Sequence, residues 1–169
     1  EIDIPLNLEM AATDEMLKIA LKYHPNAACI VPENREERTT EGGLNVIEGF
    51  SHLKPIIRAL THEGIRVSLF IEPSVQQIDA TIELGATVVE FHTGAYCMLT
   101  GERQSRELVR IQNAAKYAKK LELEVHAGHG LGFINVAAIA KIPEVIELNI
   151  GHFLMGEAMF SGLEKSIKK

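Results

Sequence analysis

The chain has 169 residues, of which 46% are hydrophobic and 24% are charged, and its formal net charge is −6 at pH 7. This composition is typical of a soluble globular domain that can bury a core, and no apolar run approaches the roughly 20 residues of a membrane helix. The 17 Lys and Arg residues are dispersed, so nucleic acid and membranes are poor candidate partners, whereas anionic small molecules are not excluded.

Apolar and β-branched runs predict strands at residues 5–10, 27–33, 66–72, 87–93, 124–130 and 145–152. Helical spacing of apolar residues predicts helices at residues 13–23, 52–63, 74–84, 103–121, 134–141 and 153–167. Thr13, Ser74 and Asn135 stand where a first turn needs a capping oxygen, and Gly64 and Gly85 stand where helices end in a left-handed residue.

Strands that alternate with helices predict an α/β fold with a parallel sheet, and no linker divides residues 1–169. Polar residues end almost every strand, namely Glu9, Glu33, Glu72, Glu90 with His92, His129 and His152. Because barrels assemble their sites from such strand ends, we favour a (β/α)8 TIM barrel over a doubly wound open sheet. The chain supplies six of the eight strand–helix units.

Two strands carry pairs of polar residues two positions apart, so each pair points to one face of the sheet. Asn7 and Glu9 form the first pair, and their apolar neighbours predict a buried carboxylate with a functional reason to be there. Glu90 and His92 form the second pair, which suits acid–base chemistry. The structural alternatives are a solvated or Lys-paired Glu9 and an ion pair that fills the barrel.

Two glycine-rich turns predict a phosphate site. In residues 126–132, HAGHGLG, glycines leave backbone amides free for an anion and place His129 beside it as an acid or base, although an exposed His in a turn is the alternative. Gly151 and His152 end the last predicted strand, where the N-terminus of the next helix begins. In barrels the loops after the last two strands often bind phosphate.

The long polar loop at residues 33–49 is predicted to be a lid or a binding loop. Its Thr39, Thr40, Gly42 and Gly43 offer hydroxyl and amide hydrogen bonds, and the alternative is a solvated segment. Cys29 and Cys97 lack metal-ligand spacing and indicate free thiols in a cytoplasmic protein, with a single disulfide as the alternative.

Several stretches, in this order and spacing, resemble the pyridoxine 5′-phosphate synthase family of deoxyxylulose-dependent vitamin B6 biosynthesis: NLEMA (7–11), VPE (31–33), TTEGGLNV (39–46), VSLFIE (67–72), HTG (92–94), AGHGL (127–131), IPE (142–144) and ELNIGH (147–152). The resemblance implies condensation of 3-amino-2-oxopropyl phosphate with 1-deoxy-D-xylulose 5-phosphate, with release of phosphate and water. It also implies no metal or organic cofactor and a homo-oligomer, and the sequence has no GxGxxG motif after a strand.

The resemblance also implies roles for individual residues. By motif, Glu9 is a proton acceptor, His129 is a proton donor, and Glu90 stabilises charge in the transition state. Thr39 binds the deoxyxylulose phosphate, and the aminooxopropyl phosphate is held by Gly130, Gly151 and His152.

The chain departs from the family at its front. The chain lacks an initiator Met and any secretory signal, and the family's first strand with an NIDH-type motif, its second strand and an Arg/His-rich loop have no counterpart. Residues 1–169 are therefore predicted to be the C-terminal three-quarters of a single TIM-barrel domain. Two alternatives remain: a catalytically incomplete fragment with an assembly role, or another sugar-phosphate barrel enzyme, although the strand-end lysine or metal-ligand set that it needs is not found.

Overall fold

The computed structural model describes residues 3–32 and 42–169, and its sheet has six parallel strands in the order β1-β2-β3-β4-β5-β6. The strands are β1 Asn7–Ala11, β2 Ala27–Val31, β3 Arg66–Ile71, β4 Val88–His92, β5 Glu124–Gly128 and β6 Val145–Asn149. The helices are α1 Asp14–Tyr23, α2 Val46–His62, α3 Val75–Glu83, α4 Gly94–Met98, α5 Gly101–Lys120, α6 Val136–Ala140, α7 His152–Ser161 and α8 Leu163–Lys168.

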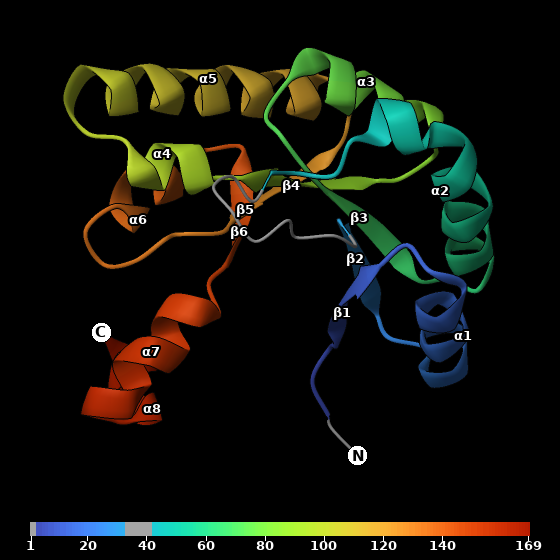
Figure 1. Cartoon of the computed structure of the whole chain (residues 1–169), viewed down its shortest axis with the longest axis horizontal. Helices are drawn as coiled ribbons and strands as arrows, with labels where there is room; N and C mark the ends of the chain where they lie inside the picture. Colours follow the sequence, from blue (N-terminus) through green and yellow to red (C-terminus); the bar gives the residue numbers. More distant parts are fainter. Residues whose placement is uncertain (1–2, 33–41) are drawn as a thin grey trace.

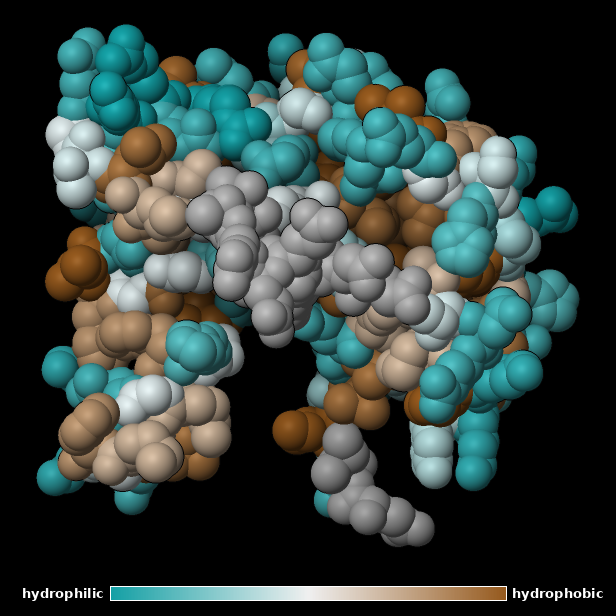
Figure 2. All heavy atoms as spheres, in the orientation of Figure 1, coloured by the Kyte–Doolittle hydropathy of each residue, from teal (hydrophilic) through white to brown (hydrophobic). Residues whose placement is uncertain are grey.

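The sheet curls like part of a barrel wall, and α1, α2, α3 and α5 follow its outer side (Figure 1). Each strand pairs with the strand that precedes or follows it in the sequence, which is the order of a singly wound barrel. The predicted α/β barrel arrangement is confirmed, and a doubly wound order is not seen. A wide hollow separates the arm of α7 and α8 from the arm of β1 and α1 (Figure 2).

Alternation along the strands decides which side chains meet the helices. In β4 the apolar Val89 and Phe91 belong to the main hydrophobic core, while Glu90 and His92 point to the opposite, concave face. The core therefore fills the space between the convex face of the sheet and the helices. The concave face receives the polar side chains, several of them buried, such as Ser68.

Most predicted helix boundaries are confirmed by their caps. The side chains of Thr13 and Ser74 accept hydrogen bonds from the backbone at the first turns of α1 and α3. Gly64 and Gly85 have positive φ angles of 75° and 81° after α2 and α3. Asn135 stands at the N-cap position of α6 as predicted, but its side chain makes no capping bond, because its Oδ1 accepts from the backbone N–H of Gly132 in the preceding turn.

Three other boundaries differ from the prediction. Helix α2 starts at Val46, inside the predicted loop, because Asn45 caps it by accepting from the backbone N–H of Glu48. The predicted helix at 153–167 is divided into α7 and α8 at Gly162, whose φ is 86°. The short helix α4 was missed, since five residues are too few to show a period.

Apolar side chains are exposed around the ends of the sheet. They include Ile146 of β6, and in α7 and α8 they are Met155, Met159, Phe160, Leu163 and Ile167. No helix in residues 3–32 and 42–169 is both long and apolar enough to span a membrane.

Candidate active site

A buried carboxylate stands at the centre of the concave face. Glu90 of β4 is 7% exposed, and Asn149 at the end of β6 donates a 2.7 Å hydrogen bond to its Oε2. The thiol of Cys29 on β2 lies 3.5 Å from the same oxygen and donates to it. The carboxylate of β4 is thus held by side chains from β2 and β6. Gly128 of β5 leaves room for it, because a Cβ there would lie 2.2 Å from Oε1 of Glu90.

The surroundings of Glu90 move its proton affinity into the physiological range. Burial raises the pKa of Glu90 to about 7, against the lowering effect of the hydrogen bonds from Asn149 and Cys29. The negative charges of Glu9 and Glu147 raise the pKa further. Burial also raises the pKa of the Cys29 thiol, which therefore stays protonated and serves as a donor. A carboxyl group poised near neutral pH suits acid–base or charge-stabilising work.

This raised pKa predicts that the protein loses stability with rising pH. Glu90 in the folded protein keeps its proton up to about pH 7, whereas in the unfolded chain it loses the proton near its ordinary pKa of 4.5. Its stabilising contribution is therefore complete below about pH 4.5 and is lost as the pH rises through 7, by roughly 3 kcal/mol in total. Urea unfolding at pH 5 and pH 8 should show this loss in the wild type and not in Glu90→Gln. The same pH dependence in both proteins would contradict the assignment.

Glu9 lies on the same concave face, but it is not buried. Asn7 and Glu9 are both exposed while Met10 packs into the core, so the shared face is confirmed and the predicted burial of Glu9 is wrong. The apolar neighbours point to the opposite side, toward the helices, and do not cover the carboxylate. Glu9 is level with Cys29 in the strand register and is close enough to act on the pKa of Glu90.

The turn after β5 presents His129 on a strained backbone. His129 has a φ of 78°, unusual for a residue other than glycine, and Gly130 follows with a φ of 77°. The hydroxyl of the buried Thr93 donates to the carbonyl oxygens of Gly128 and His129, at 2.8 and 2.6 Å. Strain held in place by neighbouring contacts is typical of functional sites. The His129 side chain is half-buried.

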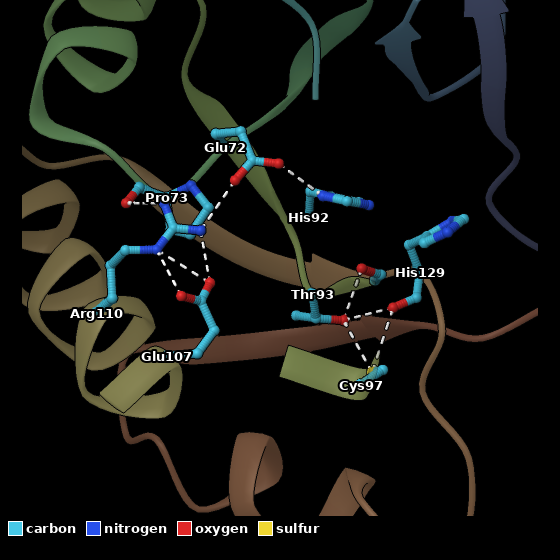
Figure 3. A network of polar contacts seen from close by, with 9 residues as sticks. Glu72, Pro73, His92, Thr93, Cys97, Glu107, Arg110 and His129 are labelled. Atoms are coloured by element: carbon cyan, nitrogen blue, oxygen red, sulfur yellow. Dashed lines mark hydrogen bonds and ion pairs between the residues drawn. The ribbon is translucent and has the colours of Figure 1, made fainter. Parts of the chain in front are cut away.

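His92 has a different partner from the one that its place in the sequence predicted. Its Nδ1 lies 2.7 Å from Oε1 of Glu72, at the end of β3, whereas Glu90 bonds to Asn149 and Cys29. The expected Glu90–His92 pair is therefore replaced by two separate groups. Figure 3 shows the second group, in which Arg110 of α5 joins Glu72 to Glu107 beside His92 and His129.

The two glycine-rich turns start at the same level of the sheet, since Gly128 of β5 pairs with Asn149 of β6. Gly130 follows the first strand, while Gly151 and His152 follow the second and begin α7. Both Gly151 and His152 are exposed, and α7 is long enough for its N-terminal amides to attract an anion. Two neighbouring turns at the carboxyl end of the strands are the arrangement that a phosphate site needs.

Part of the predicted lid lies outside the described residues, including Thr39, Thr40 and Glu33. The end of this loop is described and packs on β3. A Cβ on Gly43 would lie 2.4 Å from the backbone nitrogen of Glu72, so a residue with a side chain does not fit there. The adjacent Leu44 donates its backbone N–H to the carbonyl of Phe70 at 2.6 Å. The loop is thereby anchored beside the end of β3.

Sequence reasoning missed several residues of this site, namely Cys29, Asn149, Thr93, Arg110 and Glu107. Alternation alone places Cys29 on the inner face, and Asn149 stands in the ELNIGH stretch, so both carried a signal. Both cysteines are free, as predicted. In the described part of the chain, no group of three or more His, Cys, Asp or Glu side chains is placed to hold a metal ion.

The chain is similar to a known family over its whole length. The family model described as pyridoxal phosphate biosynthesis protein PdxJ matches residues 1–169. The pyridoxine 5′-phosphate synthase of Rhodospirillum rubrum is 60% identical over 170 residues, which cover 100% of this chain and 68% of that protein. That of Zymomonas mobilis is 59% identical and covered to 66%, so the chain spans about two thirds of these relatives.

Solved structures with low sequence identity share the fold alone. A xylose isomerase domain protein from Planctomyces limnophilus matches with a TM-score of 0.55 at 14% identity, over 86% of this chain and 62% of that one. The putative copper homeostasis protein CutC from Streptococcus agalactiae matches with a TM-score of 0.55 at 17% identity, over 87% of this chain and 72% of that one.

Proposed function

The chain belongs to the family of pyridoxal phosphate biosynthesis proteins PdxJ, and on that premise we propose that it carries the catalytic face of a pyridoxine 5′-phosphate synthase. The reaction joins 3-amino-2-oxopropyl phosphate to 1-deoxy-D-xylulose 5-phosphate, releases phosphate and water, and forms pyridoxine 5′-phosphate. Imine formation, dehydration and ring closure each require proton transfers, which carboxylates and imidazoles provide.

The observation that supports this proposal is that three acid–base groups lie on the concave face or in the turn after β5. Glu9, Glu90 and His129 come from β1, β4 and the turn after β5, and Glu90 has a pKa of about 7. We assign proton acceptance to Glu9, proton donation to His129 and stabilisation of transition-state charge to Glu90. Because Glu9 is exposed on the concave face, it can reach a substrate in the hollow of the sheet.

For the phosphates we assign one site to each of two regions. Gly130, Gly151 and His152 would hold the aminooxopropyl phosphate, because their turns follow the carboxyl ends of two neighbouring strands, β5 and β6. Thr39 would bind the deoxyxylulose phosphate, from a loop whose described end is anchored on β3 by Gly43. No residue of this set requires a metal or organic cofactor for its role.

The same proposal extends to the domain and its setting. The sheet has edges at β1 and β6, and β6 exposes the apolar side chain of Ile146; a closed barrel pairs and covers such edges. Residues 1–169 would then be the C-terminal three-quarters of one eight-unit barrel, in a cytoplasmic homo-oligomer that binds neither nucleic acid nor membranes.

The test is turnover of the two phosphorylated substrates, followed by inorganic phosphate release and by chromatographic detection of pyridoxine 5′-phosphate. The full-length protein should form phosphate and the pyridoxine product in equal amounts, and residues 1–169 alone should form neither. Product from the short chain alone would overturn the barrel-completion proposal. No product from a folded full-length protein would overturn the proposed function, and retained oligomer contacts would then favour the assembly role.

A further inference from the structure

His92 presents a buried nitrogen without a partner in the described structure. Its side chain is only 6% exposed, and its Nδ1 is bonded to Glu72. The other ring nitrogen, Nε2, is buried, yet within the described residues it makes no hydrogen bond. Nearly all buried polar atoms in folded proteins are paired, so an unpaired one points to a role that needs a second partner.

The charged groups next to His92, Glu72 and Arg110, decide which ring nitrogen of His92 carries the proton. Burial acts to raise the pKa of Glu72, but the hydrogen bonds from His92 and Arg110 and the positive charge of Arg110 outweigh it and lower the pKa to about 2. An ionised carboxylate only accepts hydrogen bonds, so Nδ1 of His92 carries a proton. Arg110 is itself held by Glu107, whose two oxygens both lie 3.0 Å from its Nε. In the neutral ring, Nε2 is consequently an acceptor.

The ring that lies next to this acceptor is His129. The two ring centroids are 4.9 Å apart with a tilt of 42°, and the rings lie side by side beyond Glu72 in Figure 3. Gly94 permits this approach, because a Cβ there would lie 2.6 Å from Nε2 of His92 and 3.0 Å from Cδ2 of His129. Phe70 packs edge-on against His92 and limits its movement.

We propose that His92 is a positioning residue for His129, whose imidazole N–H it accepts at Nε2 when substrate fills the site. The contact keeps the His129 ring protonated and oriented for proton donation, and the Glu107–Arg110–Glu72 chain keeps the acceptor side of His92 turned toward it. Hydrogen bonds of this kind are often long in an empty site and tighten in the complex. The inference rests on the proposed function, in which His129 donates a proton.

Asparagine and glutamine at position 92 separate this role from a structural one. The amide of asparagine stands near the position of Nδ1 and can keep the bond to Glu72, but it does not reach the position of Nε2. The amide of glutamine reaches that position and can offer its oxygen to His129. A purely structural His92 would be replaced better by asparagine, and a positioning His92 better by glutamine.

The experiment compares kcat, KM and the pH profile of His92→Asn and His92→Gln with the wild type, in the full-length protein. We expect kcat of His92→Asn to fall roughly 10-fold or more, with KM within about twofold, and His92→Gln to retain most of the wild-type kcat. The alkaline limb of the kcat profile should move to lower pH in His92→Asn. Among the described residues, Glu72 bonds to His92, and Arg110 and Glu107 continue that chain of ion pairs. The Cys97 thiol contacts the carbonyl of His129, and Glu90 shares the concave face of β4 with His92.

A wild-type kcat and pH profile in His92→Asn, or an equal loss in both variants, would overturn the proposal. If His92→Asn does not fold, Glu72→Gln tests the same hydrogen-bonded network, because the Glu72 side chain is half-exposed and its replacement is easier to tolerate. An unchanged pH profile in Glu72→Gln would also contradict the proposal. Imidazole ¹⁵N shifts of His129, recorded across the pH range with a phosphorylated substrate bound, give a readout that needs no turnover. They should change in His92→Asn even if the wild type proves inactive, an outcome that would refute the proposed function alone.

Discussion

Replacing His129 by alanine is expected to lower kcat of the full-length protein by roughly 10²-fold or more, as the loss of a positioned proton donor does. The substitution removes only the imidazole, because the contacts that hold the turn are made by its backbone. Thr93 holds the carbonyl oxygen of His129 rather than its ring, and alanine has a Cβ as histidine does, so it adds no new clash at a φ of 78°. The strained turn should therefore persist without the imidazole.

The control for this variant is His62→Ala. The His62 ring is 85% exposed at the end of α2 and should be dispensable. Steady-state phosphate release at saturating substrate measures the effect, and thermal unfolding checks that His129→Ala is folded. A rate within a few-fold of the wild type would remove His129 from the role of proton donor.

Replacing Glu9 by glutamine is expected to cost roughly 10²-fold or more in kcat, because the amide cannot accept a proton. Since Glu9 is exposed on the concave face, its replacement should change the free energy of unfolding by no more than about 0.5 kcal/mol. The loss of its negative charge should also lower the pKa of Glu90, which Glu9 raises. Glu9→Gln is thus predicted to lose activity while it keeps the free energy of unfolding of the wild type.

Glu15→Gln is the matched control, since Glu15 is an exposed carboxylate in the first turn of α1. Single-turnover rates of pyridoxine 5′-phosphate formation, with urea unfolding of the same samples, measure both effects. Nearly normal turnover in Glu9→Gln, or a large loss of stability with it, would show that Glu9 supports the fold and is not the proton acceptor.

Local periodicity was enough to predict the strands and most helices. The strand that ends in EFH and the helix that follows Ser74 depend on alternation, helical spacing and capping, which nearby residues decide. The exceptions have local causes of their own. Helix α4 has only five residues, and the side chain of Asn135 accepts from the backbone N–H of Gly132 in the turn and not from an amide of the helix.

The sequence by itself also determined that Glu9 and Glu90 face one side of the sheet and that His129 follows the carboxyl end of a strand. Only the tertiary structure decided their partners. Glu90 and His92 share a face, yet one bonds to Asn149 of β6 and the other to Glu72 of β3. Spacing along a strand sets the direction of a side chain, whereas curvature and register bring together the distant atoms that complete its hydrogen bonds.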